Sequence, residues 1–233
     1  MSTLALVHGA WHGAWCWEQL TPELEALGHR VIAMDLPCDD GAATFDDYAD
    51  VVCDAVAGVP GKDLLLVAHS LGGQTAARVA ARRLVRHVVY VCAVPPVAGR
   101  SLAQELTDDT GMLNPDYLNG LGDKDAEGRR WWVDREVATR VLFGDCDEAT
   151  ATAAFARLRP QGTRAYAIPY SLPALPTVKS TYIVCTEDRL VNPDWSRHLA
   201  RERLGIDLIE LPGSHSPFLS RPRDLAQVLN GLT

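Results

Sequence analysis

Residues 64–73 constrain the fold of this chain more than any other stretch. They read Leu-Leu-Leu-Val-Ala-His-Ser-Leu-Gly-Gly. The uniformly apolar run 64–68 is typical of a strand that is buried on both faces of a parallel sheet. Residues 71–84 are rich in small and helix-favouring side chains, which predicts a helix. Ser70 therefore lies on a sharp turn between a strand and a helix.

Such a turn requires small neighbours, because the backbone of the serine is strained and the chain doubles back closely around it. Ala68 and Gly72 occupy the positions two residues before and after Ser70. The stretch matches the nucleophile elbow Gly-x-Ser-x-Gly, with alanine at the first glycine. A string of this kind also occurs in ordinary solvated turns. The interpretation therefore depends on the strand, the helix and suitable partners further along the chain.

The rest of the chain alternates between strands and helices. Further strands are predicted at residues 4–7, 30–34, 87–92, 181–185 and 206–211, and further helices at 17–27, 45–59, 148–159 and 223–229. This alternation indicates an α/β fold with a mainly parallel sheet and helices on both faces. It is interrupted once, by a loop-rich, proline-containing segment. We predict a core of residues 1–96 and 178–233, with residues 97–177 inserted as a cap.

Length and composition restrict the class of protein. The 233 residues suit one large domain or a domain with one insertion. The net charge of −8, without any Lys/Arg-rich run, argues against a nucleic-acid partner. No secretion signal and no apolar run long enough for a membrane span is apparent, so we expect a cytoplasmic protein without membrane contact. The six cysteines lack metal-binding spacing, and we expect them to be reduced.

Two candidate partners of Ser70, an acid and a histidine, lie much further along the chain and complete a catalytic pattern. A serine hydroxyl becomes a good nucleophile only when a base takes its proton, and a third group must orient that base. On this architecture the order is serine, then acid, then histidine. Asp188, favoured over its neighbour Glu187, follows the predicted strand 181–185, and His215 follows the last strand. Singly, Asp188 could be a turn residue and His215 an ordinary loop histidine. Their joint order and position predict a triad.

An acyl-transfer site also needs N–H donors for the negatively charged oxygen of the intermediate. Leu71 provides one at the start of the predicted helix, where the helix dipole helps. Ala10 provides the other from the loop after the first strand, although the glycines of that loop are equally typical of a tight turn. We expect His12, in the same loop, to order the backbone by hydrogen bonding and to take no part in the chemistry.

Two tryptophans are candidates for substrate contacts. Trp11 lies in the loop after the first strand, and Trp131 lies in the predicted cap. Because Trp131 and Trp132 are adjacent, only one of them can point inward from an extended segment. Packing inside the cap is an equally good explanation of that pair. We expect no cofactor and no metal.

Several stretches of the chain are similar to a known family. They are Val7-His8-Gly9-Ala10-Trp11-His12-Gly13-Ala14-Trp15, Glu25-Ala26-Leu27-Gly28-His29-Arg30-Val31, Tyr182-Ile183-Val184-Cys185-Thr186-Glu187-Asp188 and Gly213-Ser214-His215. Through them the chain resembles the α/β-hydrolase superfamily over nearly its full length. More narrowly, it resembles the plant methylesterase and hydroxynitrile lyase group. The resemblance implies six parallel strands and a cofactor-free Ser70–His215–Asp188 triad.

Two positions distinguish the branches of that group. The lyases carry threonine where this chain has Gly9, and lysine where it has Ser216. The esterases carry glycine at the first position and usually methionine at the second. Gly9 therefore favours an esterase, whereas Ser216 departs from both patterns.

We thus expect a serine esterase that cleaves small, fairly apolar carboxylic esters through an acyl-enzyme. A thioesterase, a lactonase and a non-catalytic small-molecule-binding protein are the alternatives. The only partner expected is a small-molecule ester. The sequence leaves the oligomeric state open, with a homodimer as one alternative.

Overall fold

Six strands form one parallel sheet in the order β2-β1-β3-β4-β7-β8. The computed structural model describes residues 1–233. The strands are β1 (Thr3–Val7), β2 (Arg30–Ala33), β3 (Leu64–His69), β4 (His87–Val91), β7 (Ser180–Cys185) and β8 (Asp207–Leu211). The predicted α/β fold with a six-stranded parallel sheet is confirmed.

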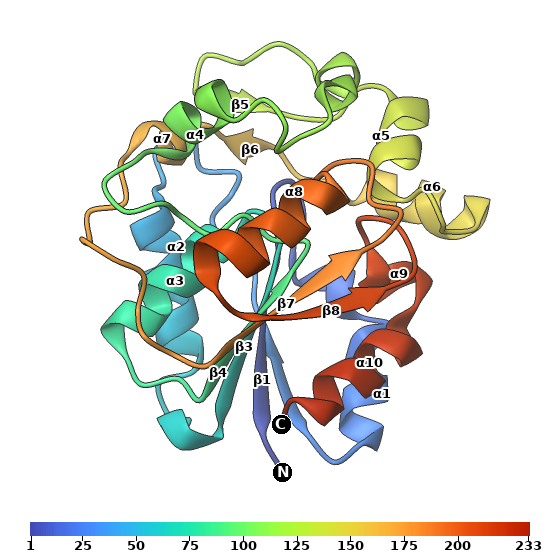
Figure 1. Ribbon diagram of the computed structural model, residues 1–233. Coiled ribbons are helices and arrows are strands. Elements are labelled where there is room, and N and C mark those ends of the chain that lie inside the picture. Colours follow the sequence, from blue (N-terminus) through green and yellow to red (C-terminus); the bar gives the residue numbers. More distant parts are fainter.

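Helices cover both faces of the sheet (Figure 1). The helices of the chain outside the segment between β4 and β7 are η1 (Ala14–Trp17), α1 (Leu20–Ala26), α2 (Phe45–Ala55), η2 (Gly61–Asp63), α3 (Gly72–Arg82), α8 (Pro193–His198), η4 (Leu199–Leu204), α9 (Pro217–Ser220) and α10 (Pro222–Gly231). Helices α1 and α10 pack together on one face, and α2 and α3 pack together on the other. No helix of the structure combines the length and the apolar character needed to cross a membrane.

The segment between β4 and β7 lies over the carboxyl ends of the strands (Figure 1). Its elements are α4 (Leu102–Asp108), η3 (Pro115–Gly120), β5 (Arg129–Arg130), α5 (Arg135–Leu142), α6 (Glu148–Ala156), β6 (Gln161–Gly162) and α7 (Arg164–Ala167). We call residues 97–177 the cap segment; its exact limits stay a prediction. Two ion pairs join it to the core. The guanidinium of Arg157 lies 2.6 Å from the carboxylate of Glu18, and that of Arg159 lies 2.6 Å from the carboxylate of Asp39.

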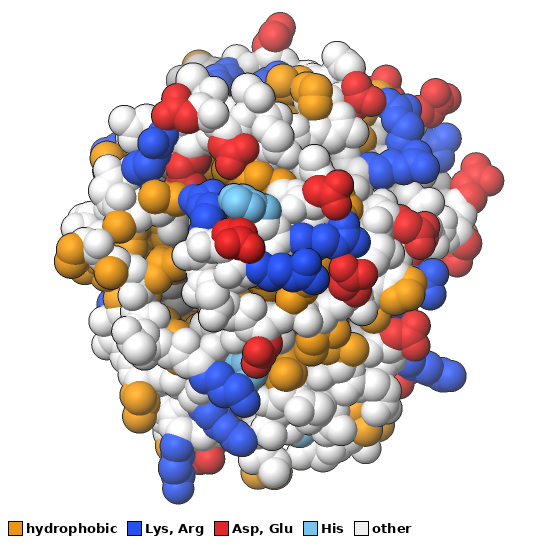
Figure 2. Space-filling view, in the orientation of Figure 1, with side chains coloured by type: hydrophobic (Ala, Val, Ile, Leu, Met, Phe, Trp, Pro, Cys, Tyr) orange, Lys and Arg blue, Asp and Glu red, His pale blue; other side chains and the backbone are white.

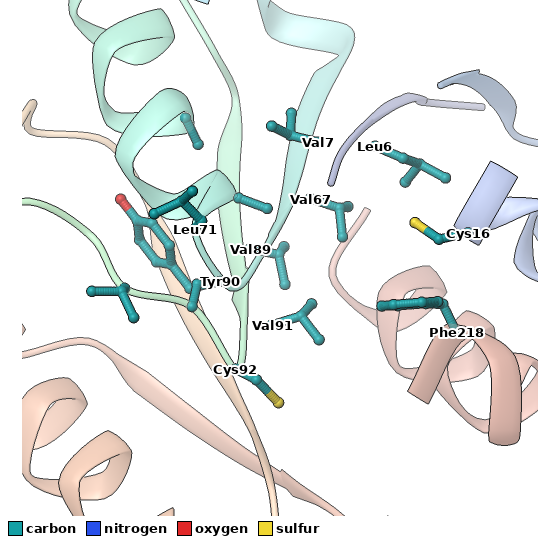
Figure 3. Close-up of a cluster of buried hydrophobic side chains, with 14 of the residues drawn as sticks. Leu6, Val7, Cys16, Val67, Leu71, Val89, Tyr90, Val91, Cys92 and Phe218 are labelled. Atoms are coloured by element: carbon teal, nitrogen blue, oxygen red, sulfur yellow. The ribbon is translucent and has the colours of Figure 1, made fainter. Parts of the chain in front are cut away.

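The core explains why the central strands are so apolar. Every residue of β1, β3 and β4 is buried, whereas the edge strands β2 and β8 are only partly buried. Side chains alternate between the two faces of a strand. In Figure 3, Tyr90 points to one side of the sheet, and Val89 and Val91 point to the other, toward Phe218. The sheet is therefore packed on both sides, as the run 64–68 predicts.

The first predicted helix, 17–27, is divided in the structure. A 3-10 turn occupies Ala14–Trp17, and α1 begins only at Leu20. The reason is Pro22, which lacks an N–H and fits only the first turn of a helix. A helix starting at residue 17 would place Pro22 in its interior. Gly28, with φ +85, follows the C-cap residue Leu27 and ends the segment in the left-handed conformation, as predicted.

Several helices lie outside the predicted set. They are α4, α5, α7 and η3 of the cap segment, together with η2, α8, η4 and α9. Helix α8 nevertheless begins with recognisable signals: the Asn192 side chain accepts a hydrogen bond from Asp194 N–H at 2.9 Å, and Pro193 takes the first helical position. The predicted helix 45–59 ends early, at Ala55.

Positive and negative side chains are intermixed on the face shown in Figure 2. Ion pairs form between surface side chains, for example between Arg197 and both Asp194 and Glu210, each at 2.7 Å. All six cysteines are free; Cys53 and Cys146 are partly exposed, and the other four are buried.

Candidate active site

Ser70 occupies the strained turn between β3 and α3. Its φ of +52 lies in the left-handed region that non-glycine residues rarely adopt. Backbone hydrogen bonds hold it there: Ser70 N–H donates to Val91 at 3.1 Å, and Val94 N–H donates to the Ser70 carbonyl at 2.9 Å. A Cβ on Gly72 would lie 2.7 Å from the carbonyl oxygen of Val7. The small residue two positions after the serine is thus required by close packing.

Asp188 and His215 form a buried pair. His215 Nδ1 lies 2.7 Å from Asp188 Oδ2, and both side chains are almost inaccessible to solvent. The other carboxylate oxygen, Oδ1, accepts the N–H groups of Leu190 at 2.8 Å and Val191 at 3.0 Å. A carboxylate that only accepts hydrogen bonds fixes the proton on Nδ1 and leaves the Nε2 lone pair available. Glu187 is exposed and makes no contact of this kind.

His69 connects the loop of His215 to the nucleophile. It directly precedes Ser70, and its Nε2 donates to the backbone carbonyl of His215 at 2.9 Å. The two imidazole rings are 4.6 Å apart. Burial holds the pKa of His69 well below its ordinary value, so the ring is neutral. Ser70 Oγ makes no hydrogen bond to His215 in this structure; in free hydrolases that contact is often long and tightens with substrate.

Two buried histidines fix the loop after β1. His8 Nδ1 donates to the Gly9 carbonyl at 2.8 Å, and its Nε2 accepts Leu36 N–H at 3.0 Å. His12 Nδ1 donates to the Ala10 carbonyl at 2.7 Å. Burial lowers the pKa of His8 to about 4 and that of His12 to about 3. Both rings are therefore neutral, and the expected ordering role of His12 agrees with its hydrogen bond.

The fixed carbonyls determine where the N–H groups point. In a planar trans peptide the C=O and N–H point in opposite directions, so the hydrogen bond from His8 to Gly9 sets the direction of Ala10 N–H. Neither Ala10 N–H nor Leu71 N–H has a hydrogen-bond partner in the protein. Both residues line the same cavity as Ser70. The arrangement offers two free donors beside the serine.

Gly9 lies directly against the nucleophile. A Cβ at this position would be 2.8 Å from Ser70 Cβ and 2.9 Å from His69 Nδ1. Such distances are far below van der Waals contact. Any side chain at position 9 would therefore displace either the serine or the histidine before it.

The cavity beside Ser70 is a narrow slot of about 50 Å³. Its walls come from the loop after β1, the elbow and the cap segment, and no charged side chain is among them. The lining residues are Ala10, Trp11, Ser70, Leu71, Val94, Leu102, Leu106, Met112, Leu113, Tyr117, Tyr166 and Leu190. A larger groove of about 560 Å³ elsewhere on the molecule contains none of the predicted site residues. The small slot is therefore the candidate active site.

The structure separates the two candidate tryptophans. Trp11 lines the slot, as expected. Trp131 is not among the lining residues and is 38% exposed; its contact with a substrate stays a prediction. Trp132 takes the inner position instead, with its ring 5.5 Å from that of Trp11 and against Gly120. Neighbouring residues of an extended segment point to opposite sides, and the space above Gly120 accommodates Trp132.

Cys92 is the third member of a compact group with Asp188 and His215, whose potential ligand atoms all lie within 4.8 Å of one another. Burial raises the pKa of the Cys92 thiol well above its ordinary value, whereas a metal needs the thiolate. Asp188 and His215 are also bonded to each other. These residues suit a catalytic pair better than a metal centre.

The buried histidines predict an acid-sensitive fold. The pKa of His8, His12 and His69 is lower in the folded chain than the ordinary value of 6.5. The unfolded chain therefore binds more protons below pH 6.5, and stability is complete above that pH and falls as the pH decreases toward 4. Each histidine contributes a slope of about 1.4 kcal/mol per pH unit in this window.

Denaturant unfolding between pH 7.5 and 5.5 measures this effect, because carboxylates titrate mostly below that range. We expect the free energy of unfolding to decrease steadily below pH 6.5. A His198→Gln variant, which changes an exposed histidine, serves as the control and should show the same decrease. A free energy that is constant over this range would contradict neutral burial of the three rings.

Comparisons with known proteins agree with this geometry. A family model described as "Alpha/beta hydrolase family" matches residues 4–228. The chain is 28% identical to a probable esterase, PIR7A, from Oryza sativa subsp. indica, over 96% of this chain and 93% of the relative. It is 29% identical to methyl jasmonate esterase 1 from Vitis vinifera, over 96% and 94%. The crystal structure of polyneuridine aldehyde esterase superimposes with a TM-score of 0.86 at 24% identity, covering 100% of this chain and 99% of that one.

Proposed function

The chain belongs to the alpha/beta hydrolase family and is a carboxylic ester hydrolase, and we propose that Ser70, His215 and Asp188 perform the hydrolysis. The observation that supports this most is the buried hydrogen bond between His215 Nδ1 and Asp188 Oδ2 at 2.7 Å. It leaves His215 Nε2 free to act as a base at the carboxyl ends of the strands, where the strained Ser70 also lies.

The first half of the reaction forms an acyl-enzyme. His215 Nε2 takes the proton of Ser70 as Oγ attacks the ester carbonyl carbon. The carbonyl oxygen becomes negatively charged and accepts hydrogen bonds from the N–H groups of Ala10 and Leu71. Collapse of this intermediate breaks the bond to the alkoxy oxygen, and His215 protonates the departing alcohol. The acyl group then remains on Ser70.

The second half releases the acid. Water enters, His215 takes one of its protons, and the oxygen attacks the acyl carbon. The same two N–H groups stabilise the second tetrahedral intermediate. Its collapse frees the carboxylic acid, and the proton returns from His215 to Ser70. Asp188 keeps the imidazole oriented and stabilises its positive charge throughout.

The cavity determines the class of ester that we propose. Its walls are apolar and carry no charge, so burying a charged substrate group there would be costly. Small, fairly apolar, uncharged esters fit these walls best. A thioester or a lactone would undergo the same chemistry, and a panel of p-nitrophenyl esters, thioesters and lactones separates the three. A protein that only binds its ligand would leave all of them intact and would not react with an active-site serine probe.

We expect measurable ester hydrolysis and no cyanohydrin cleavage above the buffer rate. Cyanide release requires a group that stabilises a developing anion beside the catalytic histidine, and Ser216 is neutral and buried. Gly9 has no hydroxyl to hold the cyanohydrin oxygen, and the tight contact with Ser70 leaves no room for one. The free N–H groups of Ala10 and Leu71 favour acyl attack instead.

Mandelonitrile and a short aryl ester, assayed side by side at equal enzyme concentration, test this expectation. The Ser70→Ala variant provides the background for both substrates. Cyanide release that depends on Ser70, together with an inert ester, would contradict our interpretation of Gly9 and Ser216.

A further inference from the structure

A carboxylate of the cap segment contacts the loop that carries His215. Asp145 lies in the turn between α5 and α6, beside the loop that precedes α9 (Figure 1). Its Oδ1 accepts a hydrogen bond from the Ser214 hydroxyl. Ser214 directly precedes His215 and is buried. The cap segment therefore reaches the residue next to the proposed base.

The second oxygen of Asp145 faces a positive charge. Asp145 Oδ2 lies 3.4 Å from Arg221 Nε, directly before α10, and the Asp145 side chain is mostly buried. A Cβ on Gly213 would lie only 2.7 Å from the same oxygen. The carboxylate can approach the loop this closely because position 213 has no side chain. Asp145 thus contacts both the loop and the chain that leads into α10.

Three successive residues of the loop are held from different directions. The Gly213 carbonyl accepts the N–H of Glu187 at 3.0 Å. The His215 carbonyl accepts His69 Nε2 at 2.9 Å. Ser214, between them, makes no hydrogen bond through its backbone, so its side-chain bond to the cap segment is the polar contact that holds it. Displacing a reacting group by about 1 Å can cost about a hundredfold in rate.

Building on the proposed triad, we propose that Asp145 is a positioning residue for His215. Its hydrogen bond with Ser214 and its ion pair with Arg221 fix the loop so that the imidazole can take the serine proton. Hydrogen bonds to a carboxylate are stronger than those between neutral groups. Neither Asp145 nor Ser214 lines the slot, so their effect falls on the chemical steps and not on substrate binding.

Steady-state kinetics with a short aryl ester tests this role. Asp145→Ala should lower kcat by about thirtyfold or more, because the loop that carries the base loses its anchor. Its KM should stay within about threefold, because His215 serves both halves of the reaction and no wall of the slot is changed. Asp145→Asn, whose amide oxygen can still accept from Ser214, should keep at least about a third of the original kcat.

Ser214→Ala removes the same hydrogen bond from its donor side. We expect it to lower kcat by about tenfold or more, the effect of one hydrogen bond to a charged group. The double variant Asp145→Ala/Ser214→Ala should be no slower than Asp145→Ala, because both changes remove one shared interaction. If Asp145→Ala does not fold, Ser214→Ala decides the question by itself.

Asp147→Ala is the matched control. Asp147 lies two residues further along the same turn and caps α6 by accepting Thr150 N–H at 2.7 Å, without a hydrogen bond to the His215 loop. We expect it to reduce thermal stability and to keep kcat within about threefold. Thermal unfolding is recorded for every variant, and all assays are run well below the lowest Tm.

Three results would overturn the proposal: an unchanged kcat in Ser214→Ala, equal losses of kcat in Asp145→Ala and Asp147→Ala, or a raised KM with kcat unchanged in Asp145→Ala. Losses that multiply in the double variant would contradict it as well. Failure of the proposed triad is a different result, because the unmodified protein would then show no hydrolysis that depends on Ser70 and His215.

Discussion

Replacing Ser70 by alanine is expected to lower kcat for ester hydrolysis by about a millionfold, the loss found when a hydrolase nucleophile is removed. The acyl-enzyme can no longer form, and only the N–H groups of Ala10 and Leu71 and the binding slot remain. The fold should be unaffected, since the Ser70 hydroxyl makes no hydrogen bond to His215 and alanine suits a turn that favours small residues. The strained φ of +52 has the same conformational cost for serine and for alanine.

Steady-state kinetics with a short aryl ester measures this loss, and thermal unfolding reports on the fold. Both should be recorded on the same preparation, because a variant that unfolds would also be inactive. A folded Ser70→Ala protein that retains more than about one per cent of the activity would show that another group performs the attack.

Replacing Asp188 by asparagine is expected to lower kcat by about 10⁴-fold. Asparagine preserves the shape of the side chain and can still accept the N–H groups of Leu190 and Val191. Its amide, however, presents a donor to His215 Nδ1, so the ring takes the opposite tautomer and Nε2 carries the proton. A protonated Nε2 cannot accept the proton of Ser70.

Glu187→Gln is the natural control, because it makes the same change of chemistry one residue away. Glu187 is exposed, and we expect its variant to keep kcat within about threefold, as surface substitutions usually have little effect. If Glu187→Gln lost activity and Asp188→Asn kept it, the acid of the triad would be Glu187.

The sheet could be predicted from the sequence, and so could the residues at the carboxyl ends of its strands, because both depend on local signals. The run 64–68 is long and apolar enough to indicate a buried strand, and the small residues around Ser70 indicate a sharp turn. Parallel strands present their carboxyl ends at one edge. Asp188 and His215, each shortly after such a strand, were therefore expected near each other.

The cap segment was harder to predict because its elements are short and held by tertiary contacts. Helix α7 has four residues and β5 has two, too few to show a periodic pattern. The inner position of Trp132 depends on the space at Gly120, which comes from another element. For the same reason Tyr117 and Tyr166 could not be placed on the cavity wall from the sequence.

His8 and His69 were missed for a different reason. Their roles depend on the particular backbone carbonyl that each ring meets, at Gly9 for His8 and at His215 for His69. A histidine in a loop or at a strand end is equally compatible with solvent exposure. Its position directly before Ser70 was the only signal that pointed to His69.

Covalent labelling of the serine tests the central claim most directly. The protein is treated with an aryl fluorophosphonate, and the modified residue is identified by mass spectrometry of proteolytic peptides while the labelling rate is followed on the intact chain. We predict a single adduct, on Ser70, that forms at least about a hundredfold more slowly in a His215→Ala variant, since the base no longer takes the serine proton. An adduct on any other residue, or an unchanged labelling rate in that variant, would contradict the account.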